Sequence, residues 1–199
     1  MFMAASIVAL SFGAFGQDES MEEGNSGDGY NHATFDVDFG FNRAFAKFTP
    51  GYSPKFIGFG HIGLGASYWP NARFGVKGYL GNERFKNPSE ASKNLYSTNL
   101  TRISFLGLIN LGRICQFEDW TQTIGLFMHA GPGFAFMSGR TLTDQPTREF
   151  MGVLQLGFTP YFKINDKLSI TTDLTLLGNV RQGKTFDMHS LTGIGGFSG

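Results

Sequence analysis

A two-residue alternation of apolar and polar side chains runs through nearly the whole chain and constrains the fold more than any other feature. It is clear in HIGLGASYWPNARFGVKGYLG, residues 61–81, where Ile62, Leu64, Ala66 and Tyr68 recur at every second position. The positions between them are glycine or serine. A segment so rich in glycine cannot form a stable helix. It can form a strand with one apolar face and one nearly empty face.

Seven runs of this kind follow one another along the chain. They span residues 33–42, 56–69, 73–85, 99–115, 121–137, 149–163 and 167–179. Because the period of two is kept in every run, we predict an all-β antiparallel meander, with helical spacing confined to the first 16 residues. Several runs exceed the ~9–11 residues that cross a bilayer at a tilt.

The connections between the runs alternate between short and long. The short ones are rich in Asn and Asp, as hairpin turns are, and comprise Pro70-Asn71-Ala72, residues 117–120 and residues 164–166. The long ones are polar and comprise residues 43–55, 86–98, 138–148 and those after 180. This alternation puts all short turns at one end of the sheet, as in an up-and-down transmembrane β-barrel.

The two faces of the runs differ in a way that favours a membrane barrel. One face is aliphatic and aromatic, whereas the other mixes glycine, small polar residues and isolated charges. A water-exposed face would be rich in Lys and Glu instead. A small closed barrel has a narrow lumen that side chains fill, so we expect the apolar face against lipid and the glycines inside. The alternative is a soluble lipocalin-type carrier with its apolar face inward.

The chain divides into three parts by composition. Residues 1–16, MFMAASIVALSFGAFG, are apolar and uncharged, with Ala14 and Gly16 at the −3 and −1 positions of a cleavage site, and predict a signal peptide. Residues 17–32 carry five acidic and no basic side chains and predict a flexible leader. Residues 33–199 form the barrel domain. The formal net charge of the whole chain is zero, which gives no electrostatic basis for binding nucleic acid.

Chemistry-bearing motifs are scarce. Cys115 is the only cysteine, so no intramolecular disulfide can form, and a small apolar strand residue is expected there. The histidines have no ligand-like spacing, so no metal or other cofactor is expected. His129 could act as a base, but no Ser or Asp partner is readable beside it. We therefore expect a protein that is not an enzyme.

Two sets of residues are candidates for a structural role in the barrel. The first is a polar network pointing into the lumen, made of Lys77, Arg102, Asn110, His129, Gln155 and Asp173. It could form a polar path through the barrel, but we favour a fixed network that plugs the interior. The second is an aromatic girdle at the membrane interface, made of Tyr68, Trp69, Phe74, Trp120, Tyr161 and Phe162.

Several stretches resemble the N-terminal barrel of OmpA-like outer membrane proteins, and in particular those of Bacteroidetes-type bacteria. They are HIGLGASYWPNARFGVKGYLGNERF, TRISFLGLINLGRI and GLFMHAGPGFAF. KINDKLSITTDLTLLGNVRQGKTFD, followed by GGFSG, resembles the seventh strand and last outer loop of that group. The resemblance covers roughly residues 30–199.

The resemblance implies an eight-stranded barrel in the bacterial outer membrane, with an eighth strand expected beyond Gly199. It also implies a structural role in membrane anchoring and envelope integrity. Contact with peptidoglycan would come only through a C-terminal domain absent from this sequence. The alternative function is a small porin-like channel, or a receptor that binds a ligand in its lumen or on its outer loops. The residues do not identify a loop ligand.

Overall fold

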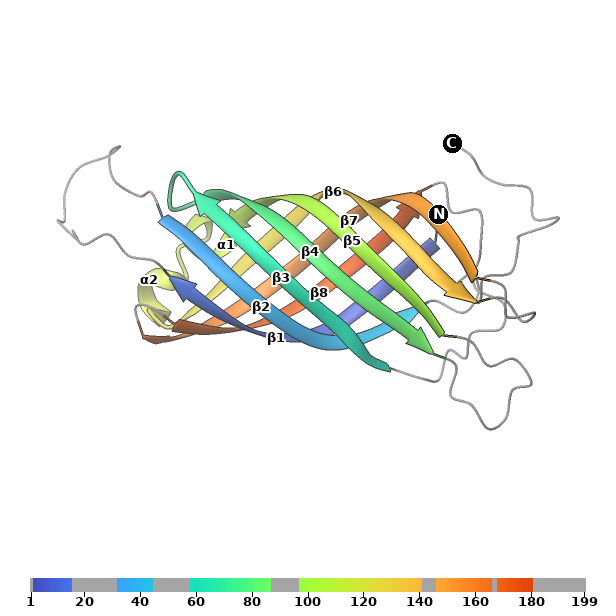
Figure 1. The fold of residues 1–199 in the computed structure, drawn as a ribbon. Coiled ribbons are helices and arrows are strands. Elements are labelled where there is room, and N and C mark those ends of the chain that lie inside the picture. The colour runs from blue at the N-terminus through green and yellow to red at the C-terminus, as the bar shows by residue number, and fades with distance from the viewer. Residues whose placement is uncertain are drawn as a thin grey trace.

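The computed structural model describes residues 2–15, 32–44, 58–86, 97–140, 146–165 and 168–180. They form a single closed barrel in which each strand pairs with the next and the last pairs with the first (Figure 1). Every pairing is antiparallel. The all-β, up-and-down architecture predicted from the alternation is confirmed.

Eight strands and two short helices make up the described structure. The strands are β1 (Phe2–Phe15), β2 (His32–Ala44), β3 (Gly58–Trp69), β4 (Phe74–Lys86), β5 (Ser97–Asn110), β6 (Ile124–Arg140), β7 (Pro146–Asn165) and β8 (Leu168–Val180). The helices are α1 (Leu111–Ile114) and α2 (Glu118–Thr121), both between β5 and β6. Strands β2 to β8 correspond to the seven predicted runs. Among the described residues, neither helix is long and apolar enough to cross a membrane.

Strand β1 closes the barrel between β2 and β8. The sequence predicts an eighth strand beyond Gly199, whereas in the structure residues 2–15 take the place between β8 and β2. The physical reason for the difference is composition, because an apolar, uncharged segment suits a strand that contacts lipid as well as it suits an export signal. The assignment of residues 1–16 to a signal peptide, and of residues 17–32 to a flexible leader, stays a prediction.

The short connections at one end of the barrel include one conventional turn and one helical segment. Asn71 Oδ1 accepts hydrogen bonds from the backbone N–H groups of Arg73 (3.0 Å) and Phe74 (2.8 Å), which shapes the turn between β3 and β4. Between β5 and β6, Asn110 caps α1 by accepting from the Arg113 N–H at 3.1 Å. The prediction that the strand continues through residues 111–115 is therefore wrong. Cys115, predicted as a small apolar strand residue, is an exposed residue at the end of α1.

Strands β6 and β7 extend further than predicted at the other end of the barrel. Strands β6 and β7 contain 17 and 20 residues and stay paired out to Arg140 and Pro146. Most of residues 138–148, predicted as a loop, therefore belong to this hairpin. The polar composition that indicated a loop is also compatible with the outer ends of strands that extend beyond the apolar band.

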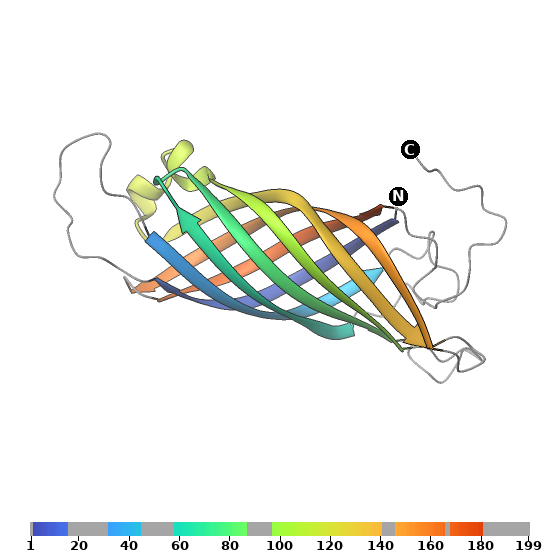
Figure 2. The same ribbon diagram turned by 45° about the horizontal axis from the view of Figure 1, so that its top comes forward.

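The two faces of the barrel have the polarity that the alternation predicted. Apolar side chains project outward from every strand from β2 to β8, whereas Asp38, His61, Glu83, Arg102 and His129 are buried inside. Figure 2 shows the tilted strands that separate these two surfaces. The most exposed large apolar side chains are Phe35, Phe59, Leu64, Val76, Phe105, Trp120, Phe134, Phe150 and Leu154. This distribution is the reverse of that in a protein that folds in water, where apolar side chains are buried and charged side chains are exposed.

Candidate functional site: the barrel lumen

The lumen contains polar side chains in its middle and apolar side chains at both ends. Paired residues on neighbouring strands place Trp69 near the short-turn end and Phe85 near the opposite end. Between them lie all the buried charged side chains of the described residues, which are Asp38, Glu83 and Arg102, with two histidines. The lumen therefore has three layers along the barrel axis.

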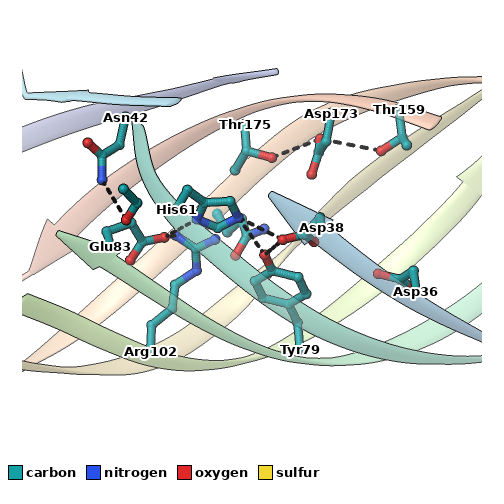
Figure 3. A network of polar contacts seen from close by, with 12 residues as sticks. Asp36, Asp38, Asn42, His61, Tyr79, Glu83, Arg102, Thr159, Asp173 and Thr175 are labelled. Carbon is teal, nitrogen blue, oxygen red and sulfur yellow. Dashed lines mark hydrogen bonds and ion pairs between the residues drawn. The ribbon is translucent and has the colours of Figure 1, made fainter. Parts of the chain in front are cut away.

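One half of the polar layer is a connected cluster on β2, β3, β4 and β5 (Figure 3). We call Asp38, His61, Tyr79, Glu83 and Arg102 the carboxylate cluster. His61 Nε2 lies 2.8 Å from Asp38 Oδ1, and His61 Nδ1 lies 3.2 Å from Glu83 Oε1. The Tyr79 hydroxyl donates to Asp38 Oδ1 at 3.0 Å. The imidazole thus bridges two carboxylates that come from different strands.

Arg102 completes the carboxylate cluster. Its Nη1 forms a close ion pair with Glu83 Oε1, and both side chains are almost fully buried. The Arg102 guanidinium carbon lies 5.1 Å from the centre of the Tyr79 ring, and Lys77 Nζ lies 5.2 Å from the same centre. Lys77 also donates to Asp36 Oδ2 at 2.6 Å. Tyr79 therefore lies close to two cations and links this cluster to the Asp36–Lys77 pair.

The other half of the polar layer is built from hydroxyl and amide groups and one carboxylate around a second histidine. We call His129, Gln155, Thr159, Asp173 and Thr175 the hydroxyl cluster, which comes from β6, β7 and β8. His129 Nε2 lies 3.1 Å from Thr175 Oγ1, and Nδ1 lies 3.3 Å from Thr159 Oγ1. Thr175 donates to Asp173 Oδ1 at 3.0 Å, whereas His129 Nε2 is 3.9 Å from that oxygen. The carboxylate thus reaches the histidine mainly through a hydroxyl.

Glycines on the inner face leave room for these side chains. A Cβ added at Gly63 would lie 2.0 Å from the Tyr79 hydroxyl and 2.2 Å from Asp38 Oδ1. A Cβ added at Gly157 would lie 2.5 Å from the His129 ring. The glycine-rich face of β3 is therefore the space that the carboxylate cluster occupies, as the narrow lumen predicted.

An aromatic layer closes the lumen at the short-turn end. The Phe127 ring lies 4.9 Å from that of Trp69 and 4.4 Å from that of Tyr161, measured between centroids. Trp69 and Tyr161 were predicted to belong to the outer girdle, but both point inward and are buried. Trp69 is in phase with Gly63, Gly65 and Ser67, so the pleat of β3 directs it to the lumen. Four other predicted girdle residues are exposed outside: Tyr68, Phe74, Trp120 and Phe162.

An apolar cluster fills the lumen at the opposite end. Its side chains are at most 2% exposed and come from β4, β5, β6, β7 and β8: Phe85, Leu100, Ala135, Met137, Met151, Val153 and Leu177. Nothing in the sequence alternation distinguished this cluster from the polar layer, because the inner face of each strand simply changes character along its length. The polar layer therefore lies between two apolar layers.

The six predicted network residues all line the lumen, but they do not form one network. Arg102 belongs to the carboxylate cluster, and Lys77 touches it through Tyr79. His129, Gln155 and Asp173 belong to the hydroxyl cluster. Asn110 lies apart at the short-turn end, where it caps α1. The prediction missed Asp36, Asp38, His61, Tyr79 and Glu83 as partners, although each is in phase with residues that it placed inside.

The geometry does not resemble a nucleophilic catalytic site. Thr175 contacts His129 Nε2, but the group on Nδ1 is the Thr159 hydroxyl, where a catalytic triad has a carboxylate. His129 is only 4% exposed, so a substrate would have to enter through one of the apolar layers. Within the described residues, no group of three or more His, Cys, Asp or Glu side chains is arranged to hold a metal ion.

Two solved structures similar to this chain are those of Ail, the attachment invasion locus protein of Yersinia pestis. Ail in complex with the heparin analogue sucrose octasulfate is 12% identical, covers 89% of this chain and 97% of its own, and gives a TM-score of 0.35. Ail alone is also 12% identical, covers 90% and 99%, and gives a TM-score of 0.37. No protein-family model and no curated protein sequence matches the chain. Likeness at this level says nothing about function.

Proposed function

We propose that this protein is a structural β-barrel of the bacterial outer membrane, with a lumen plugged by its own side chains. In this role it anchors in the membrane and contributes to envelope integrity, in the manner of the OmpA-like proteins that its sequence resembles. The proposal assigns it no enzymatic activity and no cofactor. Outer membrane lipid is its main partner.

The outer surface supports a position in a lipid bilayer. Outward aromatic side chains lie at both ends of the barrel: Tyr68, Phe74, Trp120 and Phe162 at the short-turn end, and Phe41, Phe59, Phe136 and Phe150 at the other. Along β6, Ile124 and Phe136 are 12 residues apart. At the strand rise and tilt typical of membrane barrels, this separation spans about 27–33 Å along the barrel axis, enough to cover the ~25 Å height of an outer membrane apolar band.

The burial of the central charges is the observation that favours a plug over a pore. Glu83 is 0% exposed and Arg102 is 1% exposed, although both lie in the middle of the barrel. In a porin, side chains at this level border a water-filled channel. Burial of this kind is expected when side chains fill the lumen of a barrel of about eight strands, and it supports a plug.

Conductance in planar lipid bilayers tests this proposal. We expect the folded barrel to insert without producing channel openings, because ions cannot pass the aromatic layer, the polar layer and the apolar cluster. A matched control is a double variant that shortens Trp69 and Phe127 to alanine and opens only one end. It should also stay silent. Reproducible openings of the unmodified barrel would contradict the plug and support the porin-like alternative.

Export through residues 1–16 is a separate part of the proposal. We expect the mature protein to begin at Gln17, as the small residues at positions 14 and 16 predict. Another strand would then have to fill the place of β1, because open sheet edges are not stable in lipid. N-terminal sequencing of protein purified from outer membranes decides this point. A mature chain that retains residues 2–15 would show that β1 is a permanent barrel strand.

Two further parts of the proposal come from the resemblance. Attachment to peptidoglycan would require a C-terminal domain of the kind that follows many OmpA-like barrels. A Bacteroidetes-type origin rests on the sequence patterns of β3 to β6 and β8. Fractionation tests the location itself, since recovery of the protein in a soluble fraction without detergent would exclude an outer membrane barrel.

A further inference from the structure

Apart from His61, the carboxylate cluster contains more potential negative charges than positive ones. Within it, Asp38 and Glu83 contribute two potential negative charges, Arg102 contributes one positive charge, and the Tyr79 phenol is neutral. Arg102 and Glu83 are at most 2% exposed at their side chains, and Asp38 and His61 are each 4% exposed. An uncompensated charge in such a site is strongly destabilising.

The neighbouring charges do not correct this imbalance. Lys77 forms its own ion pair with Asp36, so that pair is already neutral. Asp173 adds a negative charge, and His129 lies 3.9 Å from it on the far wall. Among the described lumen residues, only His61 is placed to neutralise the second carboxylate of the cluster.

The contacts of the His61 ring show which of its forms fits. Nε2 faces Asp38 Oδ1 at 2.8 Å, and Nδ1 faces Glu83 Oε1 at 3.2 Å. A neutral imidazole has one N–H and one lone pair. A neutral ring, in either tautomer, would leave two buried carboxylate oxygens within 3.2 Å of uncharged imidazole nitrogens. In the doubly protonated ring, Nε2–H donates to Asp38, and Glu83 Oε1 lies at ion-pair distance from Nδ1, although Nδ1 forms no hydrogen bond there.

The Tyr79 hydroxyl fits the same form. It lies 2.9 Å from His61 Nε2 and donates to Asp38 Oδ1 at 3.0 Å. Because its proton is used on Asp38, its lone pairs remain available to an Nε2–H donor. If Nε2 carried only a lone pair, it would face a hydroxyl oxygen and a carboxylate oxygen with no proton left to share.

We propose that His61 is a permanent imidazolium, so that the barrel holds one proton in its lumen between Asp38 on β2 and Glu83 on β4. With this proton in place the charges of the carboxylate cluster sum to zero. The site is a buried proton-binding site whose role is to join three strands by charge, and it is independent of whether the lumen conducts ions.

Nitrogen NMR of the histidines tests the proposal directly. The barrel is labelled with ¹⁵N-histidine, refolded in detergent micelles and recorded near neutral pH, with the His61→Gln and His129→Gln variants used to assign signals. We expect both His61 nitrogens to show the shifts of a protonated ring. A neutral His61, which would mean that a carboxyl group carries the proton instead, overturns the proposal.

A double-mutant comparison tests the charge balance by a second route. His61→Gln leaves the cluster with one negative charge, whereas Asp38→Asn with His61→Gln restores neutrality. We therefore expect the double variant to unfold at a higher urea concentration than His61→Gln alone, even though it removes more native groups. A double variant that is less stable than the single variant would count against the imidazolium. The NMR measurement on the unmodified barrel stays decisive if the variants fail to fold.

Discussion

The two histidines of the lumen are held in opposite ways. His61 lies between carboxylates from two strands, with Arg102 completing the charge balance. His129 lies between threonine hydroxyls, with Asp173 reached mainly through Thr175. Both threonine hydroxyls donate to Asp173, so His129 has uncharged neighbours and one carboxylate at 3.9 Å, whereas His61 has two carboxylates within 3.2 Å. Nearby negative charge favours the protonated form of an imidazole. The attraction for a second ring proton is therefore stronger at His61 than at His129.

The largest contrast should appear when each cluster loses one partner. Arg102→Met leaves Glu83 buried without its guanidinium, and we expect the free energy of unfolding to fall by about 3–5 kcal/mol. Thr175→Val removes a hydroxyl from the hydroxyl cluster and should cost about 1 kcal/mol. Urea titration of barrels refolded in lipid vesicles measures both.

A control for Arg102→Met is the double variant that also carries Glu83→Gln. Removing the unpaired carboxylate should recover part of the lost stability. If Arg102→Met costs no more than Thr175→Val, charge is not what distinguishes the two clusters.

Filling the inner glycines tests how tightly each cluster is packed. Gly63→Ala places a methyl group against Tyr79 and Asp38, and Gly157→Ala places one against His129. We expect losses of about 1–3 kcal/mol in the free energy of unfolding, with the larger loss at Gly63. Gly78→Ala is the matched control, because an added Cβ there meets nothing within 4 Å. Equal stability of the Gly63 and Gly78 variants would show that the carboxylate cluster can rearrange.

The smallest effect is expected at Asp173. Its side chain is 20% exposed and accepts from the Thr159 and Thr175 hydroxyls, which an amide oxygen can replace. We expect Asp173→Asn to cost under about 1 kcal/mol by the same titration. Asp38→Asn, the matching change in the carboxylate cluster, should cost more, since it removes the partner of a charged ring. A larger loss of stability for Asp173→Asn than for Asp38→Asn would contradict the difference proposed between the two clusters.

The sequence predicted the faces of the strands but not the contacts across the lumen. Alternation alone placed Ile62 outside and Gly63 inside, and it would also have placed Trp69 inside had the phase of β3 been followed to its end. It could not bring Asp38 to His61 and Glu83, because those contacts depend on the stagger between neighbouring strands. A single strand carries no information about that stagger.

Two other differences arose from local features. Residues 111–115 look like the end of a strand in the alternation, but Asn110 caps a helical turn there. Residues 2–15 have an apolar composition that suits both an export signal and the strand β1, so each of these segments is compatible with two local structures. Cleavage of residues 1–16 as a signal peptide stays a prediction.

The two tryptophans of the chain give it a built-in pair of optical probes. Trp120 is 79% exposed at the outer surface, whereas Trp69 is 4% exposed in the aromatic layer. A lipid-borne quencher such as a brominated acyl chain should dim the emission of Trp120 and leave that of Trp69 nearly unchanged. Variants with one tryptophan each would report insertion into the bilayer and packing of the lumen as separate signals. Time-resolved fluorescence during refolding can thus show whether insertion into the bilayer precedes packing of the lumen.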